Sequence, residues 1–163
     1  MAANEDIIDG GDILVYVNTG TALAPTWTPA FHCTECGIDH STEVRTRKTK
    51  NTGKSAQKRA GEQSTTITVS ALATYNKTGE INYFTLREKQ LLGEEVMLKY
   101  SGRPAADVTA KECDISEQVG DKYEKGMFII TKVSRNDKKA EDSTMSATFE
   151  NSLAVTVETV AAP

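Results

Sequence analysis

The stretch KGMFIITKVSRNDKKAEDSTMSATFENS, residues 125–152, contains an apolar segment and an alternating segment joined by a polar loop. In the second segment, Met145, Ala147 and Phe149 alternate with the polar residues Thr144, Ser146, Thr148 and Glu150. Such alternation is typical of a strand that buries one face. Two such segments around a short polar loop predict an antiparallel hairpin that packs against a core.

The same alternation occurs nearer the N-terminus. In the stretches DILVYVNTG, residues 12–20, and STTITVSALAT, residues 64–74, apolar side chains recur at every second position. Each is therefore expected to be a strand. The polar face of the second strand consists of Thr66, Thr68 and Ser70. Between the two strands, Pro25 and Pro29 predict a loop or an irregular edge, because proline cannot donate to a ladder.

One helix is expected within NKTGEINYFTLREKQLLGEE, residues 76–95, where Ile81, Phe84, Leu91 and Leu92 recur at helical spacing. Gly93 is well placed as its C-terminal cap. In contrast, residues 48–63 are almost entirely polar and have no periodicity, so they are expected to form a long loop. Residues 102–121 are also poorly patterned and are expected to form an excursion from the fold.

Together these segments predict a mainly β protein. The expected architecture is an antiparallel β-sandwich or barrel with one flanking α-helix and a long loop. Residues 1–163 are expected to form a single domain with its core at about residues 10–155. An N-terminal arm, residues 1–10, and a C-terminal tail, residues 156–163, are expected to be flexible.

Composition excludes several classes of protein. The chain has 163 residues, with 19 basic and 23 acidic side chains, as a globular protein would. No apolar run approaches a membrane span, and the acidic N-terminus does not resemble a signal peptide. Three cysteines argue against a disulfide framework and favour synthesis in a reducing cytoplasm. No catalytic motif or cofactor-binding loop occurs, so we expect neither enzymatic activity nor a cofactor.

The segment FHCTECGIDH, residues 31–40, has the residue types of a metal site. Cys33 and Cys36 have the spacing of a zinc knuckle, and His40 follows them. A continuous strand would nevertheless point the two cysteines to opposite faces. A structural zinc ion also needs four ligands, and the distant Cys113 is a poor fourth. We therefore expect no metal here, and the alternative is a small zinc-binding or nucleic-acid-binding module that uses these residues and the basic segment 45–59.

Charge is distributed unevenly along the chain. Residues 45–62 contain seven basic side chains, Arg45, Arg47, Lys48, Lys50, Lys54, Lys58 and Arg59. Residues 1–44 contain none, and their acidic side chains include Glu5, Asp6, Asp9 and Asp12. The basic segment lacks the aromatic residues that stack on nucleic-acid bases. A basic and an acidic segment in one chain indicate head-to-tail association of identical subunits, so both sets are candidate interface residues.

The order of these segments resembles the major tail tube proteins of long-tailed phages. The resemblance is carried by GGDILVYVNTGTALAPTWTPAF, residues 10–31, and by YEKGMFIITKVSRNDKKAEDSTMSATFENSLAV, residues 123–155. It implies a fold shared with the type VI secretion tube, hexameric rings that stack into a tube, and DNA that passes through the lumen only as cargo. It also implies assembly in the bacterial host cytoplasm, a place in the virion tail, and three partners besides the chain itself: tape measure, tail terminator and distal tail proteins.

The family also places the long loop between neighbouring subunits or rings. A conduit for DNA must not hold its cargo, so a polar or mildly acidic lining with few basic residues is expected. The candidate lumen faces are two polar strand faces, Thr66, Thr68 and Ser70 in one and Thr144, Ser146, Thr148 and Glu150 in the other.

Overall fold

A computed structural model of the chain describes residue 10 and residues 13–29, 32–75, 81–101 and 118–162. The expected N-terminal arm, its acidic residues Glu5, Asp6, Asp9 and Asp12, Cys113 and most of the 102–121 excursion lie outside these residues. Among the described residues, the only helix with α geometry is too short to cross a membrane.

The described residues form one antiparallel sheet and one α-helix, which confirms the mainly β fold. The strands are β1 (Leu14–Asn18), β2 (Trp27–Pro29), β3 (His32–Arg47), β4 (Gln57–Leu72), β5 (Glu95–Ser101), β6 (Lys122–Asn136), β7 (Thr144–Asn151) and β8 (Thr156–Thr159). Their order in the sheet is β2-β1-β5-β6-β7-β4-β3, and β8 also pairs with β6. The hairpin expected from the stretch 125–152 is β6–β7, and the strand around Trp27 is a short edge strand.

The sheet bends until its two ends meet. The thiol of Cys36 on β3 lies 3.7 Å from the carbonyl oxygen of Ile13, just before β1. The bend encloses a core of alternating side chains, Val15, Val17, Ile67, Val69, Ala71, Leu86, Val96, Leu98, Phe128, Ile130, Met145, Ala147 and Phe149. The expected core residues of the two alternating stretches, Ile67 and Val69 with Met145, Ala147 and Phe149, are therefore confirmed.

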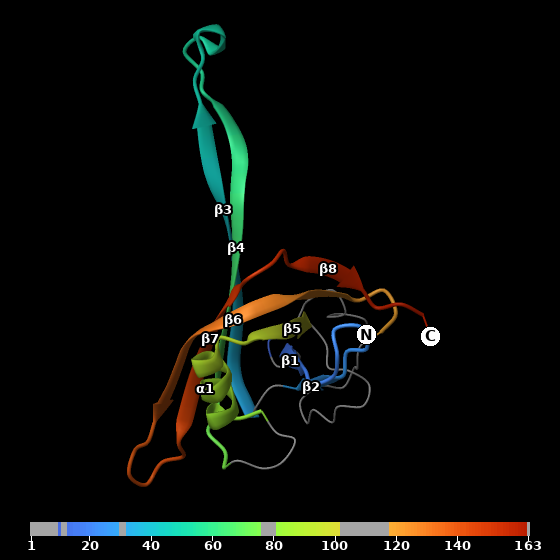
Figure 1. Cartoon of the computed structure of the whole chain (residues 1–163), viewed down its shortest axis with the longest axis vertical. Helices are drawn as coiled ribbons and strands as arrows, with labels where there is room; N and C mark the ends of the chain where they lie inside the picture. The colour runs from blue at the N-terminus through green and yellow to red at the C-terminus, as the bar shows by residue number, and fades with distance from the viewer. Residues whose placement is uncertain (1–9, 11–12, 30–31, 76–80, 102–117, 163) are drawn as a thin grey trace, which may run out of the picture.

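Helix α1 (Tyr83–Leu92) packs against β6 (Figure 1). It begins later than the sequence pattern indicates, and Leu86 is its buried residue, whereas Leu91 and Leu92 are largely exposed. Gly93 has a φ of 67° and its backbone N–H bonds the carbonyl oxygens of the last turn, which confirms the expected cap.

The N-terminal cap of α1 is Asn82, which is 1 % exposed. Its side-chain oxygen accepts hydrogen bonds from the backbone N–H groups of Phe84 and Thr85. We expect Asn82→Ala to lower the free energy of unfolding by about 1–2 kcal/mol, the usual cost of losing such a cap. Asn82→Asp keeps the acceptor and is the matched control in urea unfolding. Equal stability of the two variants would show that the cap does not stabilise the helix.

The expected long loop is shorter than the sequence pattern indicates. Strand β4 begins at Gln57, so the connection between β3 and β4 is residues 48–56, with a 3₁₀ turn at Lys50–Thr52. The prediction of a loop over 48–63 is therefore wrong for residues 57–63. These residues lack apolar alternation because both faces of the strand are exposed there, so no burial imposes a period of two.

The final strand lies in the range expected as a tail. β8 pairs with the first part of β6, with Lys125 opposite Thr156. Glu158 on β8 accepts hydrogen bonds from Lys125 and from the hydroxyl of Tyr123, both at 2.9 Å. These contacts, with Lys125 the larger cause, lower the pKa of Glu158 and hold β8 against the sheet.

Candidate subunit interface

The largest projection of the molecule is the β3–β4 hairpin. Beyond the paired residues Ser41 and Ser64, its two strands leave the sheet and extend away from the rest of the chain (Figure 1). We call residues 41–64 the arm. No residue from Asp39 to Ser64 is buried, and Val44 is 60 % exposed. An isolated two-stranded hairpin is only marginally stable in water, so the arm lacks the packing that would fix it in a free protomer.

The seven basic candidate residues all lie on this arm. Arg45 and Arg47 are on β3, Lys48, Lys50 and Lys54 are in the connecting loop, and Lys58 and Arg59 are on β4. Arg45 has carboxylate partners on the arm itself, Glu43 and Glu62, at 3.5 Å. Among the described residues, the other six have no carboxylate within 4.0 Å. The arm therefore carries a concentration of cations that its own fold does not neutralise.

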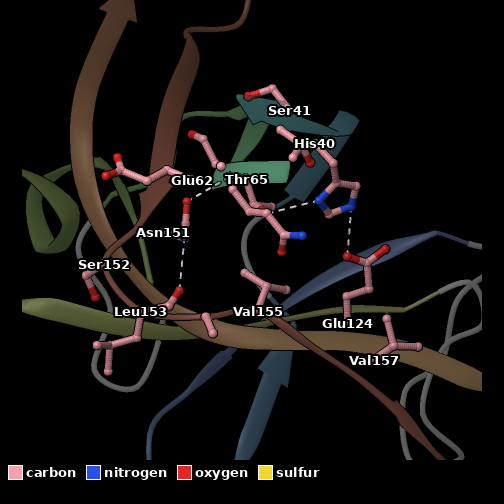
Figure 2. A pocket seen from close by; sticks show the side chains of 15 residues that line it. His40, Ser41, Glu62, Thr65, Glu124, Asn151, Ser152, Leu153, Val155 and Val157 are labelled. Carbon is pink, nitrogen blue, oxygen red and sulfur yellow. Dashed lines mark hydrogen bonds and ion pairs between the residues drawn. The ribbon is translucent and has the colours of Figure 1, made fainter. Parts of the chain in front are cut away.

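A groove lies at the root of the arm (Figure 2). It has a volume of about 920 Å³ and separates the arm from the segment that joins β7 to β8. One wall consists of arm-root residues, among them His40, Glu62 and Thr65. The opposite wall combines the polar Glu124, Asn151 and Ser152 with apolar residues, of which Leu153 and Val157 are 60 % and 65 % exposed. Exposed apolar side chains in a groove are typical of a surface that binds another protein.

Two strand edges border this groove. β4 pairs with β7 only up to Thr66, so along residues 57–64 one edge of β4 has no partner strand among the described residues. β5 and β8 pair with the same part of β6, so they occupy its two opposite sides. The other edge of β8 is likewise without a partner strand in the described part of the chain. Unpaired edges are the usual site at which a second chain adds a strand.

Polar contacts fix the shape of the groove. Asn151 accepts a hydrogen bond from the backbone N–H of Thr65 at 2.7 Å and donates one to the carbonyl oxygen of Leu153 at 3.1 Å. His40 Nε2 lies 2.9 Å from Glu124 Oε2, and its Nδ1 lies 2.9 Å from the hydroxyl of Thr65. Figure 2 shows that these contacts join the arm root to both β6 and the β7–β8 segment. These contacts therefore hold the groove in shape within a single protomer.

The two candidate lumen faces form one surface. Thr66, Thr68 and Ser70 on β4 lie opposite Glu150, Thr148 and Ser146 on β7. Cross-strand partners share a face of the sheet, so these side chains and Thr144 lie on the side away from the core. We call this side the outer face. It continues onto the neighbouring strands with Glu35, Asp39, Lys132, Ser134 and Glu95.

The structure separates the cysteines from the histidine. Cys36 pairs with Val69, whereas His40 pairs with Thr65, four residues further along β4 or about 13 Å at strand spacing. No group of three His, Cys, Asp or Glu side chains in the described part of the chain is arranged to hold a metal ion. The prediction that Cys33 and Cys36 point to opposite faces is wrong. A bulge at Thr34 shifts the register, and both cysteines pack toward the core.

Sequence reasoning missed the groove. Asn151, Leu153 and Val157 were not singled out, because a groove between two unpaired edges depends on where β4 leaves the sheet. A partial signal exists at Gly61, where a side chain would lie 3.0 Å from Glu43 Oε2, and a bulge occurs in the adjacent register. Glycine inside a strand is a recognised mark of a bulge.

The described residues define a class of protein: a curved antiparallel sheet with one packed helix and a long basic arm. The chain matches no protein-family model and no curated protein. Solved structures do match. A chain from the tail of an empty GTA particle with C6 symmetry aligns with a TM-score of 0.64 at 12 % identity, covering 92 % of this chain and 98 % of that chain.

Two further structures have the same fold. The SPP1 tail tube protein aligns with a TM-score of 0.59 at 11 % identity over 95 % of this chain and 81 % of that chain. A chain of the anti-feeding prophage baseplate aligns with a TM-score of 0.58 at 11 % identity, covering 91 % and 93 %. The chain therefore has the fold of the tail tube proteins of phage-like particles, and the resemblance found in the sequence is confirmed.

Proposed function

We propose that this chain is the major tail tube subunit of a long-tailed phage or a related particle. Six copies form a ring, and stacked rings form the tube through which DNA passes. The observation that carries the proposal is the arm, a projecting hairpin without a buried residue. Of its seven cations, only Arg45 has a carboxylate within 4.0 Å among the described residues. The length and charge of the arm are accounted for when neighbouring subunits cover it.

The arm and the groove are complementary parts of one head-to-tail contact. The arm has exposed strand edges, a basic surface and the apolar Val44, and the groove has the unpaired edge of β8, the carboxylate of Glu124 and the exposed apolar Leu153 and Val157. A contact between two different surfaces of the same protein closes into a ring when the rotation between copies is a whole fraction of a turn. The C6 symmetry of the GTA tail supports six copies. The acidic residues Glu5, Asp6, Asp9 and Asp12 remain proposed interface residues.

The outer face is the proposed lumen lining. On β3, β4 and β7 its residues are mostly Ser and Thr, with the carboxylates of Glu35, Asp39 and Glu150. On β5 and β6 the same face has Glu95, Ile129 and three lysines, of which Lys99 is buried, Lys125 is paired with Glu158, and Lys132 is exposed. DNA binding strengthens with each phosphate that a cation neutralises, so this surface lets DNA slide. The proposed partners at the tube ends and inside it are the tail terminator, distal tail and tape measure proteins. The protein is then located in the virion tail after assembly in the host cytoplasm.

Electron microscopy tests the proposal directly. We expect the purified full-length protein, concentrated in low salt, to form six-fold rings or hollow tubes in negative stain. Native mass spectrometry of the same sample should give hexamers and multiples of hexamers. A protein that stays monomeric at every concentration and ionic strength, or that forms rings of another symmetry, contradicts the proposal.

Charge on the arm should control assembly. We expect the combined Lys48, Lys50, Lys54 and Lys58→Gln variant to need about tenfold more protein for assembly, because four exposed ion pairs of a few tenths of a kcal/mol each are lost. Added salt should weaken wild-type assembly, since charges are screened over about 10 Å at 0.1 M, and should affect the variant less. The measurement is the pelleted fraction against protein and salt concentration.

The matched control replaces the same four lysines by arginine. It keeps the charge and should assemble like the wild type. Salt-independent assembly of the wild type, or an arginine variant as weak as the glutamine variant, would show that the arm does not act through its charge.

A further inference from the structure

The proposed function assigns no role to Cys33 and Cys36, the two free cysteines of β3. On a regular strand, residues three apart point to opposite faces. Here Cys33 pairs with Ala71 and Cys36 pairs with Val69, because Thr34 is the extra residue of a bulge. Ala71 and Val69 are two apart on β4, and both are buried in the core. The two cysteines therefore stand as next neighbours on one face.

The spacing of the pair suits a bridging ion better than a disulfide. Positions two apart on a strand are about 6.6–7 Å from one another, at the upper limit of Cα separations found in disulfides. A disulfide needs sulfur atoms about 2.05 Å apart. A metal ion with bonds of about 2.3 Å to each thiolate joins sulfur atoms up to about 4.6 Å apart.

A ligand can reach both sulfur atoms from solvent. Each cysteine is half-buried, so the pair is accessible from solvent while one side contacts the core. The thiol of Cys33 donates to the carbonyl oxygen of Glu35 at 3.3 Å, and that of Cys36 lies 3.7 Å from the carbonyl oxygen of Ile13. The Cys36 contact places that side chain where β3 meets the residue before β1, and Cys33 lies beside it on the same face.

We propose that Cys33 and Cys36 form a two-thiolate site for a soft, thiophilic monovalent metal ion of the Cu(I) class. Thiolates select such ions, and two of them suffice where a structural zinc ion needs four ligands. In the described part of the chain no third His, Cys, Asp or Glu joins the pair, which disfavours zinc. Binding replaces two thiol protons by one Cu(I), without oxidation of the protein. The site does not depend on the proposed tube and would exist in the free protomer.

A competition titration tests the site. The reduced full-length protein is mixed without oxygen with Cu(I) held by bicinchoninate, whose visible absorbance falls as the protein takes the metal. We expect one Cu(I) per chain, and at least tenfold weaker binding in both Cys33→Ser and Cys36→Ser. Cys113→Ser is the matched control and should bind like the wild type. Zn(II), titrated separately, should not bind stoichiometrically.

Several results would overturn the proposal. These are no Cu(I) uptake by the wild type, uptake that survives loss of Cys33 or Cys36, uptake that requires Cys113, or stoichiometric Zn(II). A second measurement uses only the wild type, in case a serine variant does not fold. Phenylarsine oxide joins two close thiols through two S–As bonds with release of water, and mass spectrometry should locate it on the peptide with residues 33–36. Its absence from that peptide would show that the thiols cannot share one ion.

Discussion

Replacing residues 42–63 by an Asn-Gly turn should abolish tube formation and leave the protomer folded. Ser41 and Ser64 are paired across β3 and β4, so a two-residue turn can join them. None of the removed residues is buried, so the core and the unfolding midpoint should change little. Assembly should be lost because the variant retains the outer face but lacks the strand edges and cations that reach the next subunit. Negative-stain microscopy and circular dichroism measure the two effects.

A shorter deletion separates the parts of the arm. Arg47 and Gln57 are also paired, so an Asn-Gly turn between them removes only residues 48–56. This variant loses Lys48, Lys50 and Lys54 but keeps the paired strands. We expect it to form rings that stack poorly, whereas the longer deletion forms none. If the variant without residues 42–63 still forms long tubes, the arm is not part of the interface. If that variant unfolds, the shorter deletion provides the same test.

The core could be predicted from the sequence, but the arm could not. Phe149 and Val69 are buried and alternate with polar neighbours, because a strand with one buried face needs an apolar residue at every second position. In the arm neither face is buried, so nothing selects apolar residues at every second position. Residues 57–63 therefore have the composition of a loop although they form a strand.

The register between β3 and β4 could not be predicted from the sequence either. The bulge at Thr34 exchanges the faces of the residues that follow it, and no local feature of the sequence marks it. The groove was unpredictable for a related reason. Asn151 acts there through Thr65 and Leu153, so its role depends on tertiary contacts between β4 and the end of β7. The alternation of apolar and polar residues indicates which face of a strand is buried, but it does not indicate where two paired strands separate.

The proposal that the outer face lines the lumen requires the polar faces of β4 and β7 to form one continuous surface. Thr68 and Thr148 are cross-strand partners, and every residue of the two candidate faces is at least partly exposed. On an isolated protomer this surface would simply contact water. In a ring, the unpaired edges at the arm and at β8 extend the sheet into neighbours, and one of its faces then lines the hole. Because α1 packs on the face that holds the core, the outer face is the one left to line it.

We expect the double variant Thr68→Lys and Thr148→Lys to assemble into tubes that retain DNA. Both side chains point away from the core, so packing is preserved, and the variant adds twelve cations to each ring of six. Short duplex DNA should enter these tubes at low salt and become protected from nuclease, whereas wild-type tubes should protect none. Release should follow salt steeply, since each phosphate contact adds about 0.9 to the slope of log K against log salt.

Two controls make this result specific to the lumen. Thr68→Gln with Thr148→Gln tests the change of size without charge and should behave like the wild type. Lysines at the exposed helix positions Leu91 and Leu92 add the same charge on the other side of the sheet, so bound DNA there should remain open to nuclease. If the Thr68 and Thr148 lysine tubes bind DNA that nuclease still digests, the outer face lies on the outside of the tube, and the helix side must line the conduit.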